Sequence, residues 1–410
     1  MQFSEIPLDP SIIKAVAEQR FHTPTLVQQK AIPLVLQKKN VVVTANTGTG
    51  KTAAFALPIL HLLSTQNSDT KVKKINSLIL TPTRELAIQI LENCNSFGKY
   101  TAIKATAVFG GVSLEPQKEV LAKGVDILIA TPGRLIDLQM QGNIDLSTVE
   151  IFVLDEADLM LDMGFIKDIK KIESLCPKKK QTLLFSATMP NKIVELSDII
   201  IKNPIKIEIH PEQATVKNIG QLLYYLPKKN KTDLCLHLLR NTINGRIIIF
   251  RRTKFGVDKL EQTLLKNGYN AISIHGDKTQ AIRNKAIEDF KSKKAHILIA
   301  TDVAARGIDV SNVDAIINFD IPNVAETYVH RIGRTGRAGK SGIAFSFCSP
   351  DENSYIKNIE ALLEKTIKVI TDHPYPVAKP KHTKKQPNTI SKHKKGRKST
   401  ASKKKKKRWY

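Results

Sequence analysis

Two short segments carry residues whose types and spacing suit the chemistry of a triphosphate. The first, Gly48-Thr-Gly-Lys-Thr52, follows an apolar run and precedes an apolar helical pattern. Glycine lets backbone amides and a helix N-terminus face phosphate oxygens, while Lys51 suits the β- and γ-phosphates and the Thr52 hydroxyl suits Mg²⁺. The general template has Gly where Ala45 stands, and the alternative is an ordinary glycine-rich turn. We predict a nucleoside-triphosphate loop that comprises Ala45, Asn46, Thr47, Gly48, Thr49, Gly50, Lys51 and Thr52.

The second segment is the acidic run Asp155-Glu-Ala-Asp158, which follows the apolar run Ile151-Phe-Val-Leu154. Ligands of parallel sheets bind at the carboxyl ends of the strands, which is where this run falls. We expect Asp155 to hold Mg²⁺ through water, and Glu156 to orient and deprotonate an attacking water. Taken alone, an acidic tetrapeptide is commonly a solvated turn or a helix cap. Together with the phosphate loop upstream, it predicts hydrolysis of a nucleoside triphosphate.

The elements that must position these residues alternate between short runs of Val, Ile and Leu and longer helical stretches. This pattern predicts an α/β fold with parallel sheets covered by helices on both faces. A polar, proline-containing segment that begins at His210 separates two sets of strands and suits a linker. The predicted strands are Val41–Thr44, Ser77–Thr81, Ala105–Phe109, Ile127–Ala130, Ile151–Asp155, Gln181–Ser186 and Ile205–Ile209, then Gln221–Leu226, Arg246–Phe250, Ala271–Ile274, Ile297–Ala300, Ala315–Phe319 and Gly342–Cys348. The predicted domains are residues 1–209 and 218–372, with a linker over 210–217 and a tail over 373–410.

The composition points to a polyanion as the partner. The chain has 410 residues, of which 64 are Lys or Arg and 38 are Asp or Glu, and its formal net charge is +26. Residues 379–410 hold fifteen of the basic residues and no acidic one, so the rest of the chain still carries +11. Nucleic acid is the default partner for such a charge. From about residue 373 the chain loses its apolar periodicity and gains Pro and Lys, which predicts a disordered basic tail.

Membrane, secreted and metal-thiolate proteins do not fit this sequence. The chain has no uncharged apolar run of the roughly 18 residues that a membrane span needs, and its first residues do not form a signal sequence. The four cysteines lie far apart, with no CxxC pair and no His at metal-ligand spacing. We therefore expect a cytoplasmic protein with reduced, mostly buried thiols.

Further motifs follow one another in a characteristic order along both halves of the chain. They are Phe3 with Pro24-Thr-Leu-Val-Gln28, Ala45–Thr52, Pro82-Thr-Arg-Glu-Leu-Ala87, Gly110-Gly111, Thr131-Pro-Gly-Arg134, Asp155–Asp158, Ser186-Ala-Thr188, Gln280-Ala-Ile-Arg283, Ala300–Asp309 and His330–Arg337. In this order they resemble the DEAD-box ATP-dependent RNA helicases of superfamily 2, over residues 3 to about 370. The resemblance implies two tandem RecA-like domains, and the compact core with a basic tail looks most like the bacterial RhlE-type branch. In that family the phosphate loop begins with Ala, as it does here.

The resemblance assigns recognition of adenine to the Q motif near the N-terminus, and so implies ATP with Mg²⁺. The residues assigned to it here are Phe3, Phe21 and Gln28. Gln28 has the donor and the acceptor that are needed to read an adenine edge through two hydrogen bonds. Arg20 stands where the family usually has Gly, and Leu26 stands where it has Pro. These two departures are expected to alter the local turn and hence the affinity for the nucleotide.

The segment from His330 to Arg337 gathers basic residues that a helix would place largely on one face. A solvated basic helix is the alternative, but the glycines at positions 333, 336 and 339 are poor choices for such a helix. The resemblance implies that Arg334 and Arg337 reach the γ-phosphate from the second domain, with Arg337 as an arginine finger and His330 ordering the site. A finger of this kind is worth about 10³–10⁵ in rate.

Three further residues receive their roles from the resemblance alone. Asp309 is expected to contact the ribose, and Ser186 and Thr188 are expected to couple hydrolysis to closure of the two domains. A polar strand end is the alternative for the last two. If ATP and RNA each bridge the domains, closure assembles the hydrolytic site and the RNA path together.

The candidates for RNA contacts supply backbone amides, hydroxyls and guanidinium groups. Such groups suit phosphates and sugars and carry little information about bases, so we predict binding that tolerates any sequence. Ordinary loop and helix-cap residues are the alternative, and the preference for RNA over DNA is implied by the family only. The candidates are Thr83, Arg84, Gly111, Thr131, Gly133, Arg134, Arg283 and Thr301.

The sequence thus predicts an RNA-stimulated, Mg²⁺-dependent ATPase that opens short RNA duplexes locally and without processivity, or remodels RNA–protein complexes. The resemblance implies work in ribosome assembly or RNA turnover, with ribosomal precursors or RNA-decay proteins as partners. The tail is expected to add nonspecific attachment to RNA. Two other functions stay open: an RNA-binding or annealing chaperone that does not need ATP, and a DNA-translocating helicase of the same superfamily.

Overall fold

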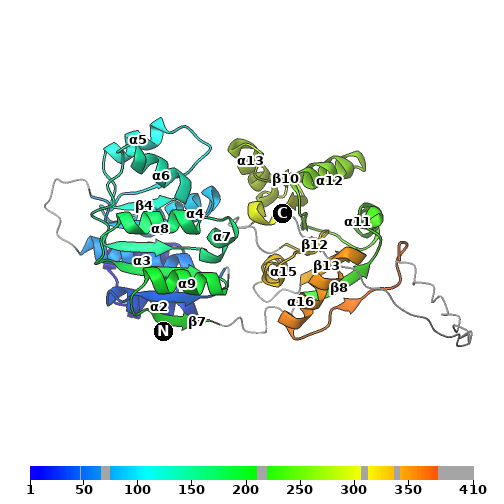
Figure 1. The fold of residues 1–410 in the computed structure, drawn as a ribbon, viewed down its shortest axis with the longest axis horizontal. Coiled ribbons are helices and arrows are strands. Elements are labelled where there is room, and N and C mark those ends of the chain that lie inside the picture. Colours follow the sequence, from blue (N-terminus) through cyan, green and yellow to red (C-terminus); the bar gives the residue numbers. More distant parts are fainter. Residues whose placement is uncertain (47, 66–73, 210–218, 306–312, 337–341, 377–410) are drawn as a thin grey trace, which may run out of the picture. The chain divides into compact units, whose positions relative to one another are not determined.

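Two seven-stranded sheets, each parallel throughout, organise the chain in this computed structural model (Figure 1). The structure describes residues 1–46, 48–65, 74–209, 219–305, 313–336 and 342–376. We call residues 1–209 the first lobe and residues 219–376 the second lobe. The predicted α/β class with two parallel sheets is confirmed. The predicted site residues Thr47, Asp309 and Arg337 lie outside the described residues, as do the linker and residues 377–410 of the tail.

The sheet of the first lobe has the strand order β3-β4-β2-β5-β6-β1-β7. Its central strands are short runs rich in Val, Ile and Leu, and all of their residues except the half-buried Thr44 are buried, as expected for strands covered on both faces. The strands are β1 (Val41–Thr44), β2 (Ser77–Leu80), β3 (Ala105–Val108), β4 (Ile127–Ala130), β5 (Ile151–Leu154), β6 (Gln181–Ser186) and β7 (Ile205–Glu208).

Helices cover both faces of this sheet. Successive side chains of a strand point to opposite faces, so each face of the sheet has its own apolar core. Val41 and Val43 of β1 belong to one apolar cluster, and Val42 belongs to the other. The helices over the first face are η1 (Phe3–Glu5), α1 (Pro10–Glu18), α2 (Leu26–Leu36), α3 (Lys51–Ser64) and α4 (Arg84–Phe97). Those over the second face are α5 (Glu115–Ala122), α6 (Pro132–Met140), α7 (Ala157–Asp162), α8 (Ile166–Leu175) and α9 (Asn191–Ile200).

The sheet of the second lobe has the order β10-β11-β9-β12-β13-β8-β14 and again a core on each face. Its strands are β8 (Ile219–Tyr225), β9 (Ile247–Phe250), β10 (Ala271–Ile274), β11 (Ile297–Ala300), β12 (Ala315–Asn318), β13 (Gly342–Cys348) and β14 (Lys368–Val369). Its helices are η2 (Lys228–Asn230), α11 (Lys231–Asn241), α12 (Lys254–Lys266), α13 (Gln280–Lys291), α14 (Asp302–Ala305), α15 (Ala325–Ile332), η3 (Pro350–Glu352) and α16 (Asn353–Leu363).

The strand order of the first lobe explains why motifs that are distant in the sequence meet. Strands β2, β5, β6 and β1 are consecutive in the sheet, and all of them are parallel. Their carboxyl ends therefore lie in a row, and the segments that follow them begin at Thr81, Asp155, Ala187 and Ala45. This edge of the sheet carries the acidic run, the phosphate loop and the segment after β6.

The predicted strands agree with the observed ones to within two residues at each end, and one strand is missed. Strand β14 has two residues, Lys368 and Val369, and both are exposed, so it lacks the apolar run that marks the others. Residues 373–376, which we expected to begin the tail, are described, and Tyr375 packs against the core of the second lobe. The ring of His373 lies 5.5 Å from that of Tyr224.

The four cysteines are buried and free, as expected. Burial raises the pKa of each thiol, Cys94, Cys176, Cys235 and Cys348, to about 12, so all four are protonated at neutral pH. Among the described residues, none of the helices is both long and apolar enough to cross a bilayer.

Candidate functional site

The predicted phosphate loop runs from β1 into α3 and depends on a glycine at its last turn. Gly50 has φ +86° and precedes Lys51, the first residue of α3. A Cβ atom at this position would lie 2.3 Å from Nε2 of Gln28, which donates to the Gly50 carbonyl oxygen over 3.1 Å. A side chain would therefore collide with Gln28 and also strain the backbone. The first residues of α3, Lys51, Thr52 and Ala53, line the cavity, and a helix N-terminus suits an anion.

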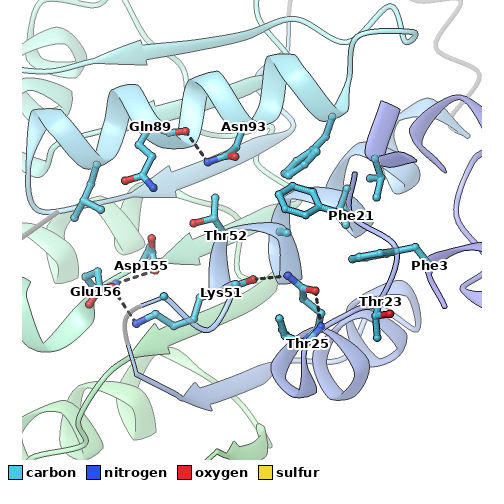
Figure 2. Close-up of a pocket in the computed structure, with 18 of the residues that line it drawn as sticks. Phe3, Phe21, Thr23, Thr25, Lys51, Thr52, Gln89, Asn93, Asp155 and Glu156 are labelled. Atoms are coloured by element: carbon cyan, nitrogen blue, oxygen red, sulfur yellow. Dashed lines mark hydrogen bonds and ion pairs between the residues drawn. The ribbon is translucent and has the colours of Figure 1, made fainter. Parts of the chain in front are cut away.

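Lys51 and Glu156 form an ion pair at one end of the site (Figure 2). Nζ of Lys51 lies 3.0 Å from Oε1 of Glu156, and their side chains are 5% and 13% exposed. Burial alone would lower the pKa of Lys51, but the carboxylates of Glu156, Asp155 and Asp158 outweigh it and raise that pKa. The lysine is therefore charged at neutral pH and available to an anionic ligand.

Asp155 and Glu156 are held in unusual states that the surrounding fold must enforce. Burial, together with repulsion from Glu156, raises the pKa of Asp155 to about 7, against the attraction of Lys51. The Glu156 amide donates to Oδ1 of Asp155 over 3.1 Å. Glu156 itself has φ +53°, a left-handed conformation that costs a non-glycine residue on the order of 1–3 kcal/mol. Strain of this kind gathers at functional sites, and here it aims the carboxylate at Lys51.

Asp158 joins the acidic run to the segment after β6. The amide and the hydroxyl of Thr188 donate to Oδ2 of Asp158 over 3.1 and 3.0 Å, and the Asp158 amide donates to the Ser186 hydroxyl over 3.1 Å. Although burial opposes it, the charge of Lys51 and these hydrogen bonds keep the pKa of Asp158 below its ordinary value. The structure thus brings Ser186 and Thr188, both predicted as coupling residues, into contact with the acidic run.

The Q motif residues Thr25 and Gln28 cap α2 and bind the phosphate loop at the same time. The Thr25 hydroxyl donates to the carbonyl oxygen of Thr49 over 2.7 Å, and the Thr25 amide donates to Oε1 of Gln28 over 2.8 Å. With its bond to Gly50, Gln28 has used one acceptor site and one N–H of its amide. One N–H and one lone pair remain for a ligand.

A cavity of about 360 Å³ lies between these elements and α4. Figure 2 shows Lys51, Asp155 and Glu156 at one end of this cavity, and Phe3 and Phe21 at the other. Phe3 is buried, whereas Phe21 is 50% exposed and its ring lies 6.4 Å from that of Phe97. The volume is in the range that holds a small organic ligand. One end of the cavity therefore suits phosphates, and the other suits an aromatic base.

Two oxygen donors in the cavity fit a magnesium ion. Thr52 offers a hydroxyl and Asp155 a buried carboxylate, and both line the cavity beside Lys51. Mg²⁺ prefers such oxygen ligands and commonly takes only one or two from the protein, with the rest from phosphates and water. The described residues hold no group of three or more His, Cys, Asp or Glu side chains that forms a metal site on its own. The residues therefore fit a metal that arrives with a phosphate ligand.

Three of the predicted RNA-contact residues surround one loop of the first lobe. Nη1 of Arg84 lies 3.4 Å from the carbonyl oxygen of Gly111, and Nη2 of Arg134 donates to that of Val112 over 3.0 Å. Gly111 has φ +75°, and a Cβ atom there would lie 1.6 Å from Nη2 of Arg84. Only glycine leaves room for this guanidinium. Thr83 and Thr131 precede α4 and α6 as their N-cap residues, and Gly133, in the first turn of α6, has open space where a side chain would stand.

The described candidates in the second lobe lie on three segments: α13, the segment after β11, and α15 with the residues that follow it. Nη2 of Arg283, on α13, lies 2.9 Å from Oε1 of Glu85, and Thr301 follows β11 and is partly exposed. Arg334 is buried and belongs to the lining of the cavity that holds Lys51. His330 lies on the last turn of α15.

Sequence reasoning gave no role to Arg331, which is buried in the last turn of α15. Its guanidinium donates to both carboxylate oxygens of Asp302 over 2.6 and 2.8 Å, and to the side chain of Asn318 over 3.1 Å. Arg331 follows His330 directly and therefore points to another face of α15, beside the buried Tyr328 and Ile332. The position of Arg331 three residues after Tyr328 and next to Ile332 is the sequence signal that distinguishes Arg331 from the other basic residues of this segment.

Comparisons with known proteins give matches in both lobes. A family model described as DEAD/DEAH box helicase matches residues 25–196, and one described as helicase conserved C-terminal domain matches residues 230–339. The DEAD-box ATP-dependent RNA helicase RhpA of Helicobacter pylori is 42% identical over 90% of this chain and 73% of its own. The DEAD-box ATP-dependent RNA helicase CshA of Geobacillus kaustophilus is 43% identical over 87% of this chain and 76% of its own.

Solved structures with similar folds carry both kinds of ligand. Dbp5 of S. cerevisiae bound to RNA and ADP-BeF₃ has a TM-score of 0.80 and 32% identity, over 90% of this chain and 95% of Dbp5. Mss116p bound to single-stranded RNA and AMP-PNP has a TM-score of 0.80 and 31% identity, over 88% of this chain and 77% of its own. The similarity therefore extends across both lobes.

Proposed function

The chain belongs to the DEAD-box family of ATP-dependent RNA helicases and is an ATP-hydrolysing enzyme, and from this premise we propose how its own residues carry out the reaction. We propose that RNA stimulates ATP hydrolysis and that closure of the two lobes on one strand opens short RNA duplexes locally, without processive movement. The observation that carries this proposal is the buried ion pair between Lys51 and Glu156 at the phosphate end of the cavity.

The ion pair suggests an order for the reaction, in which the triphosphate binds first and Glu156 becomes free to act as a base second. When the triphosphate enters, its β- and γ-phosphates compete for the ammonium of Lys51 and release the Glu156 carboxylate. Glu156 then accepts a proton from a water whose oxygen attacks the γ-phosphorus. The bond from that phosphorus to the β–γ bridging oxygen breaks, and ADP and inorganic phosphate result. The left-handed backbone of Glu156 holds its carboxylate within reach of that water.

Thr52 and Asp155 would hold Mg²⁺ beside the triphosphate, Thr52 directly and Asp155 through water. When bound, Mg²⁺ neutralises charge on the β- and γ-phosphates. A cation is bound by the charged form of Asp155. Burial raises the pKa of this carboxyl and so disfavours its negative charge when no cation is near.

Residues of the second lobe complete the site in this proposal. Arg334 and Arg337 neutralise charge that builds up on the γ-phosphate, with Arg337 as the arginine finger, and His330 orders them. Asp309 contacts the ribose. The place of Arg334 in the lining of the cavity supports its role. Because these groups come from the second lobe, hydrolysis depends on closure.

RNA lies across both lobes in this proposal, held through its phosphates and sugars. Arg84, Gly111 and Arg134 form one contact region, with Thr83, Thr131 and Gly133 beside it. Arg283 and Thr301 provide the contacts of the second lobe. The hydrogen bonds of Thr188 and Ser186 with Asp158 link the segment after β6 to the acidic run, and they support a role for both residues in coupling. The basic tail strengthens attachment, so deletion of residues 379–410 is expected to weaken RNA binding at low salt and to spare hydrolysis.

The biological setting is a proposal from the family. We propose that the protein works in the cytoplasm on ribosomal precursors or with RNA-decay proteins, in ribosome assembly or RNA turnover. The assignment to the RhlE-type branch stays a prediction, since the bacterial relatives described above carry the names RhpA and CshA.

One measurement tests the enzyme class and the choice of polymer together. The ATPase rate is measured with single-stranded RNA, with single-stranded DNA and with neither, and we expect stimulation by RNA alone. Equal stimulation by DNA would favour a DNA-translocating helicase instead. In a second assay, release of a short RNA duplex is followed with and without ATP. Equal release in both would favour an annealing chaperone.

A further inference from the structure

Helix α4 forms one wall of the nucleotide cavity, and none of the roles assigned so far uses this wall. Leu86, Gln89, Asn93 and Phe97 all line the cavity, at spacings of three, four and four residues. Such spacing places them on one face of a helix. The wall is apolar at both ends, where Leu86 and Phe97 are buried, and carries two half-buried amides between them.

Asn93 keeps hydrogen-bonding capacity that is turned toward the cavity. Its Nδ2 donates to the carbonyl oxygen of Gln89 over 2.8 Å, a bond within α4 that fixes the side chain against the helix (Figure 2). Within the residues that the structure describes, this amide makes no other hydrogen bond. Its Oδ1 and second N–H are therefore available, one as an acceptor and the other as a donor.

The position of Asn93 along the cavity decides which part of a nucleotide it meets. Figure 2 shows Gln89 on the side of Asp155 and Glu156, and Asn93 across from Thr52, nearer than Gln89 to Phe21. Asn93 stands about one helical turn, roughly 6 Å, from Gln89. A nucleotide whose phosphates lie at Lys51 and whose base lies at the aromatic end places its sugar in the middle section.

We propose that Asn93 hydrogen-bonds a ribose hydroxyl of the bound nucleotide and so makes the first lobe selective for ribonucleotides. A hydroxyl both donates and accepts, as the free edge of the Asn93 amide does, whereas a phosphate would meet only one of these groups. The inference rests on the proposed placement of ATP in this cavity. It adds a sugar contact from the first lobe, independent of the one proposed for Asp309.

The experiment compares ADP, 2′-deoxy-ADP and 3′-deoxy-ADP, with Mg²⁺, on the full chain without RNA. Calorimetry gives the dissociation constant of each for the wild type, for Asn93→Ala and for Asn95→Ala. Asn95 lies on the same helix but is exposed and outside the cavity, so its variant is a matched control. Alanine favours helix at both positions, and thermal melting verifies that the variants are folded.

We expect Asn93→Ala to bind ADP roughly two- to tenfold more weakly, the loss of one hydrogen bond. For the deoxynucleotide that lacks the contacted hydroxyl, the variant and the wild type should agree, and Asn95→Ala should match the wild type throughout. Unchanged ADP affinity in Asn93→Ala would overturn the inference, as would an equal loss for all three nucleotides, which would indicate a purely structural role. A wild type that binds none of them would overturn the nucleotide site itself, and this inference with it.

Discussion

Lys51 and Glu156 lie 3.0 Å apart, Nζ to Oε1, and this contact keeps the general base of the proposed reaction paired with the lysine that a triphosphate would claim. The two roles exclude each other, because the ammonium that contacts Oε1 of Glu156 occupies an oxygen of the carboxylate that would accept the proton. Binding of the triphosphate and activation of the base are therefore one event.

Replacement Glu156→Gln should separate binding from hydrolysis. The amide keeps the shape of the side chain but cannot accept a proton, so we expect the RNA-stimulated kcat to fall by about 10²–10⁴. Affinity for ATP should be kept or increased, because Lys51 no longer has a carboxylate competitor. Steady-state kinetics and equilibrium binding test both. Glu119→Gln, at an exposed position on α5, is the control and should change neither. Normal turnover in Glu156→Gln would refute the role of the base.

Gln28 should set the preference for adenine and also the shape of the phosphate loop. Gln28→Ala removes the bond to Gly50 and the remaining donor and acceptor together. We expect ATP affinity to fall by about tenfold or more, as the loss of two hydrogen bonds predicts, and preference for ATP over GTP to disappear. Competition binding with both nucleotides measures this. The neighbouring Gln29→Ala, whose amide bonds to Pro24, should keep the preference. An undiminished preference in Gln28→Ala would contradict the assignment.

Gly111→Ala should impair RNA binding without touching the nucleotide site. The new methyl group would overlap the guanidinium of Arg84, and the backbone φ of +75° adds strain. Displacement of a charged contact predicts an RNA affinity about tenfold lower or more. Gly110→Ala is a matched control, because a Cβ atom there meets nothing within 4 Å. Fluorescence anisotropy with labelled RNA measures the affinity, and ADP binding should equal the wild type in both. Equal RNA affinity in the two variants would remove Gly111 from the RNA face.

Most of the strands could be predicted, because buried parallel strands appear in the sequence as continuous apolar runs. Runs such as Ile127–Ala130 and Ile297–Ala300 are apolar along their whole length, and the structure buries them fully. The strand order could not be predicted, since nothing in the run after Val41 specifies β6 and β7 as its neighbours. Strand β14 was not predicted, because its two residues are exposed and the strand is defined by its pairing with β8.

The candidate site shows the same division between what local sequence encodes and what packing decides. The segment Gly48-Thr-Gly-Lys-Thr52 predicts a phosphate loop by itself, because these residue types at this spacing between a strand and a helix suit phosphate binding. Asn93 gives no such signal, since its place in the cavity depends on how α4 packs over α3. Arg331 is similar: its partner Asp302 lies 29 residues away in the sequence, and only the packing of α15 brings them together.

Asp320 should make the second lobe sensitive to acid. Although burial opposes it, the charges of Arg251 and Lys231 and the amide of Arg252 hold the pKa of this carboxyl below its ordinary value. A carboxyl with a lowered folded-state pKa contributes stability above its unfolded value near 4, and this contribution is lost as the pH falls through the folded-state pKa.

The measurement is the free energy of urea unfolding from pH 6 to pH 3. In the wild type it should decline by up to about 1.4 kcal/mol per pH unit for this one proton, beyond the decline due to other groups. Asp320→Asn should be less stable at pH 6, because it takes the carboxylate away from Arg251 and leaves Lys231 with Glu352 alone, but its stability should decline less steeply below pH 4. Asp372→Asn, at an exposed position in the same lobe, should keep the wild-type slope. If Asp320→Asn and the wild type declined in parallel, the charge of Asp320 would not be what stabilises this lobe.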